Sequence, residues 1–292
     1  PISGSDVSIG KTGNITVKLP DGTDLDAKHQ VTVIVTDHKK APQQGKNVTV
    51  KGDLGQSAAG KTDKNGELTV PEVEQTERHG VYIVGYTDGT FGPSRSMTRA
   101  EAAAIFARLL AEKNGDTIST AANTKFADIP AHAWYSGYVK YLSNNGITYG
   151  KSKTIFAPND AITRAEFTTM AVRFFDIYGS GDAEIMEQFS GFNDVSSGYW
   201  AAEYIKYAAL HGWINGYGDG SFHADREINR AEVVTIVNRL LGREADEDYI
   251  ADNLRKLNTF PDVSRKHWAY YAVMEAANAH TAVLGESESW SK

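Results

Sequence analysis

The sequence predicts two parts, an N-terminal all-β domain over residues 1–84 and an all-α region of helix-loop-helix repeats over residues 85–290. Three observations predict this division. The first part consists of short runs of β-branched residues between turn signals. In the second part, a helix-capping sequence occurs three times, 65 and 66 residues apart. A segment with Phe, then Asp two residues later, then Trp also recurs between the caps, so the region is built from repeats.

The N-terminal part reads as a series of short strands. Strands are expected in the β-branched runs 15–19, 31–35, 48–50, 68–70 and 81–84. Asn65-Gly66 is a strong hairpin signal, and several strands at this spacing predict a β-sandwich. The pattern of residues 31–37, Pro42, Gly45 and 61–67 resembles bacterial immunoglobulin-like surface domains. That resemblance implies an Ig-like β-sandwich over residues 1–84.

The capping sequence opens three helices. A Thr or Asn side chain at the N-cap accepts a hydrogen bond from the first turn, and a Glu three residues later can bond back to the cap N–H. Apolar residues follow each cap at positions +4, +7, +8, +11 and +12, which is one face of a helix. The predicted capping pairs are Thr98 with Glu101, Thr163 with Glu166, and Asn229 with Glu232.

A second helix is predicted after each Phe-x-Asp segment. The three tryptophans that follow these segments, Trp134, Trp200 and Trp268, are expected at helix starts. Gly146 and Gly212 lie twelve residues after the first two tryptophans and suit the position just beyond a helix end. The loops then contain Asp88-Gly89 and Asp219-Gly220, which favour tight turns.

The sequence begins and ends in the middle of a repeat. A half repeat (85–113) comes first, two full repeats follow (126–178 and 192–242), and a closing half repeat (260–290) comes last. An unpaired half would expose an apolar face, so the last half is expected to pack on the first. Two inserts, 182–190 and 245–258, are interpreted as helical spacers.

These motifs, in this order, resemble S-layer homology domains, and the resemblance covers residues 82–290. It implies an all-α, pseudo-threefold bundle of three units with grooves between neighbours. It further implies binding of secondary cell-wall polysaccharide, often through pyruvylated N-acetylmannosamine, with the arginine of the capping motif among the residues implicated.

That arginine is Arg99, Arg164 or Arg230 in the three copies, always at the first helical position. A cation there opposes the helix dipole, so an anion nearby is expected. Helix-start N–H groups bind anions, and a guanidinium suits a carboxylate. The partner is either an external anion or an internal acid such as Asp128, Asp194 or Asp262, and the residues alone leave both open. The resemblance favours the carboxylate of a pyruvate ketal.

Further contacts to sugar are expected from the tryptophans, although core or rim packing is the alternative for each. Backbone N–H groups at Asp88, Gly89, Asp219 and Gly220 are candidates for sugar hydroxyls, with an ordinary turn as the alternative. Glu101, Glu166 and Glu232 are assigned to capping. The units differ, since the second lacks the Asp-Gly loop and the third has Asn229 in place of Thr and Ala224 in place of Pro. The grooves are therefore not expected to bind equally, and Arg99 and Arg164 are the preferred sites.

Composition excludes several classes. A net charge of −7 argues against nucleic acid, and no apolar run approaches the roughly 20 residues of a membrane span. The chain has no cysteine, its eight histidines form no metal-binding motif, and no catalytic motif or cofactor site is recognised. Because it begins with Pro1 rather than Met, the sequence is interpreted as a piece of a longer chain, and the absence of cysteine fits an exported bacterial protein.

The expected function is non-covalent anchoring at the bacterial cell wall, without enzymatic activity. The expected partner is a pyruvylated secondary cell-wall polysaccharide or a peptidoglycan-linked glycan. The alternative is a structural module that assembles with S-layer neighbours through protein contacts. A wall hydrolase is the third hypothesis, and sugar release is not expected.

Overall fold

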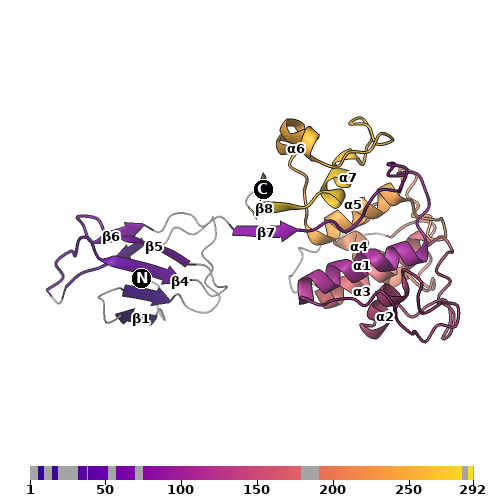
Figure 1. The fold of residues 1–292 in the computed structure, drawn as a ribbon, viewed down its shortest axis with the longest axis horizontal. Helices are drawn as coiled ribbons and strands as arrows, with labels where there is room; N and C mark the ends of the chain where they lie inside the picture. The colour runs from indigo at the N-terminus through magenta and orange to yellow at the C-terminus, as the bar shows by residue number, and fades with distance from the viewer. Residues whose placement is uncertain are drawn as a thin grey trace. The chain divides into compact units, whose positions relative to one another are not determined.

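A computed structural model describes residues 6–9, 15–18, 32–37, 39–51, 57–69, 75–178, 191–284 and 289–291 (Figure 1). The chain divides into two compact units. Unit 1 comprises Pro1–Glu77 and Thr281–Lys292, and unit 2 comprises Arg78–His280. Within the described ranges, none of the helices combines the length and the apolar character needed to cross a bilayer.

The strands form three small sheets. One has the order β1-β2-β4-β5, with β2 and β4 parallel, the second pairs β3 with β6, and the third has the order β7-β8-β9. The bounds are β1 (Asp6–Ile9), β2 (Ile15–Lys18), β3 (Thr32–Ile34), β4 (Asn47–Lys51), β5 (Ser57–Lys61), β6 (Glu67–Thr69), β7 (Gln75–His79), β8 (His280–Leu284) and β9 (Ser289–Ser291).

Unit 1 has a small apolar core to which two sheets contribute. Val17, Val48, Val50 and Leu68 are buried together, and Val33 packs against them. Alternation places Val48 and Val50 on one face of β4, as expected for a half-buried strand. The described strands nevertheless do not make up a clear Ig-like sandwich, because the pieces are short and β2 and β4 run parallel.

Two local predictions for the N-terminal part are wrong. The turn at 63–66 forms, with Gly66 at φ +72°, but its flanking strands do not pair as a hairpin. Instead β5 pairs with β4, and β6 pairs with β3. The run 81–84 is not a strand. Its Tyr82 is buried in unit 2, where the hydroxyl donates to the backbone oxygen of Val234 at 3.3 Å.

Unit 2 is helical, as predicted. Each long capped helix packs against the helix that follows the next tryptophan, so α1 packs on α2, α3 on α4, and α5 on α7. In Figure 1 the long helices α1 and α3 lie side by side, and they also contact each other. The bounds are α1 (Arg99–Asn114), α2 (Ser136–Asn144), α3 (Arg164–Tyr178), α4 (Ala202–Leu210), α5 (Arg230–Leu241), α6 (Glu247–Asn253), the 3₁₀ turn η1 (Leu254–Lys256) and α7 (Tyr270–Ala277).

The predicted capping boxes form. Thr98 with Glu101 and Asn229 with Glu232 each bond reciprocally, and Glu166 N donates to Thr163 Oγ1 at 3.2 Å while Thr163 N donates to Glu166 Oε2 at 3.1 Å. Gly146 and Gly212 follow α2 and α4 at φ +75° and +70°, the left-handed conformation predicted for them.

The three capped helices begin around a closed ring of backbone hydrogen bonds. Met97 N donates to Ile228 O at 2.9 Å, Ile228 N donates to Ile162 O at 3.1 Å, and Ile162 N donates to Met97 O at 2.9 Å. All three side chains are fully buried. Because each residue directly precedes an N-cap, this ring brings the three helix N-termini together around one pseudo-threefold axis.

The last half repeat contacts the first, as expected. Asp262 accepts hydrogen bonds from the N–H groups of Phe91 and Gly92 at 2.9 and 2.7 Å. The rings of Phe91 and Phe260 lie 5.3 Å apart. Asp128 and Asp194 hold the loops of the other two repeats in the same way. Of the two predicted spacers, the second contains α6, and residues 182–190 lie outside the described residues.

Candidate functional site

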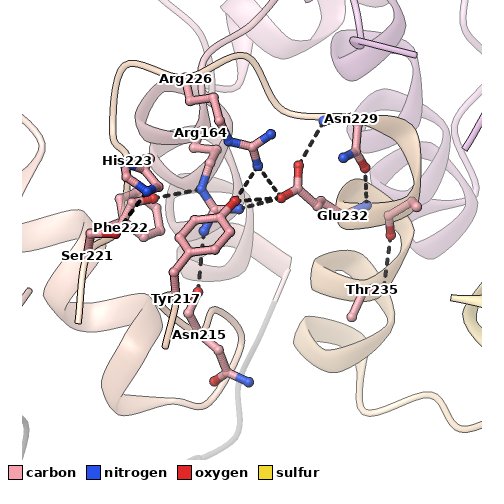
Figure 2. Close-up of polar contacts among 11 residues, drawn as sticks. Arg164, Asn215, Tyr217, Ser221, Phe222, His223, Arg226, Asn229, Glu232 and Thr235 are labelled. Atoms are coloured by element: carbon pink, nitrogen blue, oxygen red, sulfur yellow. Dashed lines mark hydrogen bonds and ion pairs between the residues drawn. The ribbon is translucent and has the colours of Figure 1, made fainter. Parts of the chain in front are cut away.

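The capping-motif arginines are buried where neighbouring repeats meet. Arg164, at the start of α3, donates through Nε to Phe222 O at 2.9 Å and through Nη2 to Asn215 O at 3.3 Å (Figure 2). Its Nη1 lies 3.0 Å from Glu232 Oε1 on α5. Arg226 and the Tyr217 hydroxyl also donate to this carboxylate oxygen. The guanidinium is therefore bound by a loop and by the next capped helix together.

The same contact recurs around the axis as a closed cycle. Arg99 Nη1 lies 2.9 Å from Glu166 Oε1, and Arg230 Nη1 lies 3.7 Å from Glu101 Oε1. Each glutamate thus serves twice, because its Oε2 caps its own helix while its Oε1 faces the arginine of the preceding capped helix. The assignment of these glutamates to capping was correct but incomplete.

The helix starts and the buried arginines differ from the sequence prediction in two ways. The helix-start N–H groups are not open to an external anion, because neighbouring backbone carbonyls accept from them. Arg99 N donates to Asp160 O and Ala100 N to Pro158 O, and α3 and α5 repeat the pattern. The internal acids are also not the aspartates that were named as one alternative, since Asp128, Asp194 and Asp262 accept loop N–H groups instead.

Burial affects the charge of these groups. Desolvation lowers the pKa of Arg164, although Tyr217 and Glu232 partly offset this, and burial likewise lowers the pKa of Arg230. An arginine starts so far above neutral pH that both remain cations. Aromatic faces add to their environment, with the Arg164 guanidinium 4.5 Å from the ring centroid of Phe222 and that of Arg230 4.7 Å from Phe91.

Two of the arginines line clefts. The Arg164 cleft holds about 260 Å³ and is bounded by residues 214–217, by α5 and by Trp268. The Arg99 cleft holds about 190 Å³ and is bounded by residues 148–150, by α3 and by Trp200. Both tryptophans are mostly exposed, Trp200 at 57% and Trp268 at 64%, so their rings are not core residues. Trp134 is 54% exposed.

A second arginine lines each cleft, and the sequence reasoning missed it. Arg173 and Arg239 both stand ten residues after their N-cap, as does Arg108 in the first repeat. Alignment of the repeats at that position was the signal that could have found them. Arg173 donates to the Tyr204 hydroxyl at 3.2 Å and covers the ring of Tyr149 at 4.8 Å. Two arginines and one glutamate leave the Arg99 cleft positively charged.

The Arg99 cleft also contains a polar group that lacks a hydrogen bond. Thr169 on α3 is 3% exposed, lines this cleft, and its hydroxyl has no hydrogen-bond partner among the described residues. Buried hydroxyls are normally paired, so this one is suited to a ligand oxygen.

The Asp-Gly loops are tight turns. Gly89 and Gly220 adopt φ +83° and +81°, and each preceding aspartate accepts from the residue after the glycine. The hydroxyls of Thr90 and Ser221 lower the pKa of Asp88 and Asp219. None of these four loop residues lines the Arg99 or the Arg164 cleft, so the structure does not bring them together with the arginines and tryptophans there.

The surroundings of Arg230 repeat the pattern, but its ion pair is longer. Its guanidinium donates to Phe91 O at 2.8 Å and to Val84 O at 2.7 Å, and it covers the ring of Tyr86 at 4.7 Å. The glutamate opposite is more distant than in the other two repeats. The sequence analysis preferred Arg99 and Arg164 to Arg230 as binding sites.

Comparison with known proteins identifies the repeats. The family model of the S-layer homology domain matches residues 69–103, 125–168 and 191–234. Cell surface glycoprotein 1 of Acetivibrio thermocellus is 34% identical over 218 residues, 72% of this chain and 9% of that protein. The cellulosome-anchoring protein of the same organism is 30% identical over 233 residues, 79% of this chain and 49% of that protein. The surface-layer 125 kDa protein of Lysinibacillus sphaericus is 32% identical over 163 residues, 54% of this chain and 13% of that protein.

The chain therefore contains three S-layer homology domains, and its relatives are cell-surface proteins. It spans less than half the length of each of these three. They carry the names of surface and anchoring proteins, whereas some other matches are enzymes by name.

Proposed function

We propose that this chain, in which three S-layer homology domains are arranged around one axis, anchors a bacterial protein to the cell wall by binding an anionic polysaccharide. The observation that supports this most is the repeated cleft. Each of the two clefts joins an exposed tryptophan, a buried arginine and a second arginine. The proposed ligand is a secondary cell-wall polysaccharide with a carboxylate-bearing sugar of the pyruvylated N-acetylmannosamine type.

The arrangement assigns a different task to each side chain. The buried arginines are bound by Glu166 and Glu232, so they contribute position and a share of the positive field. The second arginines, Arg173 and Arg239, form no ion pair among the described residues and are the cations open to a ligand carboxylate. The flat face of Trp200 or Trp268 would cover the C–H face of the sugar ring.

The clefts are small, below the roughly 300–1,000 Å³ typical of drug-sized ligand pockets, so each suits one charged sugar rather than a long chain. A single such contact is weak. Several clefts on one rigid unit would engage repeated sugars on the same polysaccharide, and avidity would raise the overall affinity by about 10²–10⁴. Strong anchoring without a covalent bond follows from this geometry.

The first test targets the exposed tryptophans, because their removal leaves the core intact. The double variant W200A/W268A should lose most binding to purified cell walls in a sedimentation assay, while its thermal melt stays close to that of the parent. R255Q, which removes an exposed arginine from η1 away from both clefts, is the control and should bind normally. Undiminished binding by the double variant would contradict the proposal.

The second test concerns the charge of the ligand. Titration with wall polysaccharide before and after mild acid removal of pyruvate should show a large loss of affinity after removal. R173Q/R239Q should bind intact polysaccharide about as weakly as the parent binds the depyruvylated form. Equal binding to both forms would exclude the carboxylate as the recognised group.

A protein-assembly role is the second candidate, because one matched relative is a surface-layer protein. Sedimentation velocity of the chain without polysaccharide separates the two. Concentration-dependent self-association without glycan would favour assembly, and a monomer that binds walls would favour anchoring. We also propose that unit 1 is a spacer and that the chain has no hydrolase activity, so incubation with walls should release no sugar.

A further inference from the structure

Two histidines and a glutamate that are distant in sequence meet inside unit 2. His79 is the last residue of β7, His280 is the first of β8, and Glu275 lies on α7. The three are 3%, 7% and 1% exposed. They lie apart from the arginine clefts, whose lining includes none of them. A search for local histidine motifs could not find this cluster, because its members come from the two ends of the unit.

The three side chains approach one another closely, with the two imidazoles facing different oxygens of the glutamate. His79 Nδ1 lies 3.2 Å from His280 Nε2 and 3.4 Å from Glu275 Oε1, and His280 Nε2 lies 3.4 Å from Glu275 Oε2. Ligands about 2.0–2.1 Å from a tetrahedral zinc ion are about 3.3–3.4 Å from one another. Each pairwise distance is therefore close to the separation of neighbouring ligands in a zinc site, and one ligand atom from each residue can be chosen so that all three lie within 4.8 Å of one another.

The hydrogen bond of His280 points to a cation between the three side chains. Its Nδ1 is 3.0 Å from the backbone oxygen of Asn278, which can only accept, so Nδ1 carries the proton. In the neutral ring, Nε2 then directs a lone pair at the glutamate carboxylate and at His79. A ring N–H held by a backbone carbonyl is the usual support of a metal-binding histidine.

Glu275 adds a second, independent indication. Both carboxylate oxygens are buried and make no hydrogen bond among the described residues. A buried carboxylate without a donor is costly unless a cation neutralises it. With both imidazoles neutral, one proton on His79 Nδ1 serves only one neighbour, and the carboxylate still faces the His280 lone pair. A metal ion contacts all three groups at once.

We propose that His79, Glu275 and His280 bind one divalent transition-metal ion, with zinc the best match to two imidazoles and a carboxylate in tetrahedral geometry. Because His79 and His280 lie at the two ends of unit 2, the ion joins the beginning and the end of the repeat region. Closing so long a loop constrains the unfolded chain, so the ion stabilises the folded unit.

The experiment measures metal binding directly. The chain is unfolded in denaturant with chelator and refolded with or without Zn²⁺, because buried ligands exchange slowly. The parent should bind one Zn²⁺ per chain in competition with a chromogenic chelator, and its melting temperature should rise with Zn²⁺. Refolding with Co²⁺ should give the intense visible absorption of tetrahedral cobalt.

Variants distinguish the site from adventitious binding. E275Q and H280N should each lower Zn²⁺ affinity by about tenfold or more and abolish the cobalt absorption. H223N is the matched control, since it removes an exposed histidine beside Asp194 and should bind as the parent does. If a variant fails to fold, the cobalt spectrum of the unaltered chain still tests whether the site binds a metal ion. Absence of tetrahedral cobalt absorption, or equal Zn²⁺ binding by a folded E275Q, would overturn the proposal.

Discussion

Replacing Arg164 with alanine should destabilise unit 2 strongly, and the structure gives the magnitude. The side chain is 5% exposed and holds two backbone carbonyls and the Glu232 carboxylate. Its removal deprives those carbonyls of its N–H donors and a partly buried carboxylate of one cation. Breaking a buried ion pair by deleting one partner costs about 3–5 kcal/mol. For a unit of this size, that corresponds to a fall in melting temperature of roughly 6–20 °C.

The assay is urea and thermal unfolding followed by circular dichroism, and R226A provides a matched control. Arg226 donates to the same Glu232 oxygen, but its side chain is 41% exposed, whereas that of Arg164 is 6% exposed. An exposed pair contributes only about 0–1 kcal/mol. A loss below about 1 kcal/mol in R164A, or an equal loss in both variants, would refute the claim that burial of Arg164 decides its role. This matters for function, because R164A would confuse unfolding with loss of ligand binding.

Two further predictions follow from the repeat contacts. Burial raises the pKa of Asp194, but two backbone N–H groups outweigh that effect and hold the pKa below its usual range. Its stabilising contribution is therefore complete above the unfolded pKa and is lost as pH falls through the lower folded value. D194N should be less stable than the parent at neutral pH, and the difference should shrink in acid, as measured by urea unfolding at several pH values. A pH-independent difference would count against this linkage. G216A should destabilise the unit, because an added Cβ would lie 2.4 Å from the Phe192 ring, whereas G218A, with open space, should melt normally. Similar melting of the two variants would show that this close approach is unimportant.

The local structure of the helical repeats could be predicted from the sequence alone. Capping boxes, helix faces and glycine helix ends depend on neighbours within a few residues, so spacing predicted them. Tandem repetition predicted three related units, and even the contact of the last half with the first followed from the need to cover apolar faces. The pairing of the N-terminal strands could not be predicted in the same way, because short β runs do not show which strands pair. The hairpin expected at Asn65-Gly66 failed for that reason.

The partners of the buried charges were decided only in three dimensions. Each arginine pairs with the glutamate of another repeat, which is 67, 68 or 129 residues away in the sequence. Local spacing does not distinguish that acid from the aspartates considered first. The helix-start N–H groups likewise donate to carbonyl oxygens of a neighbouring loop, so they do not bind an external anion. His79, Glu275 and His280 meet because the repeat region closes on itself. Sequence periodicity predicts which face of one helix is buried. The ring of backbone hydrogen bonds around the pseudo-threefold axis determines which distant charges and carbonyls come close enough to pair.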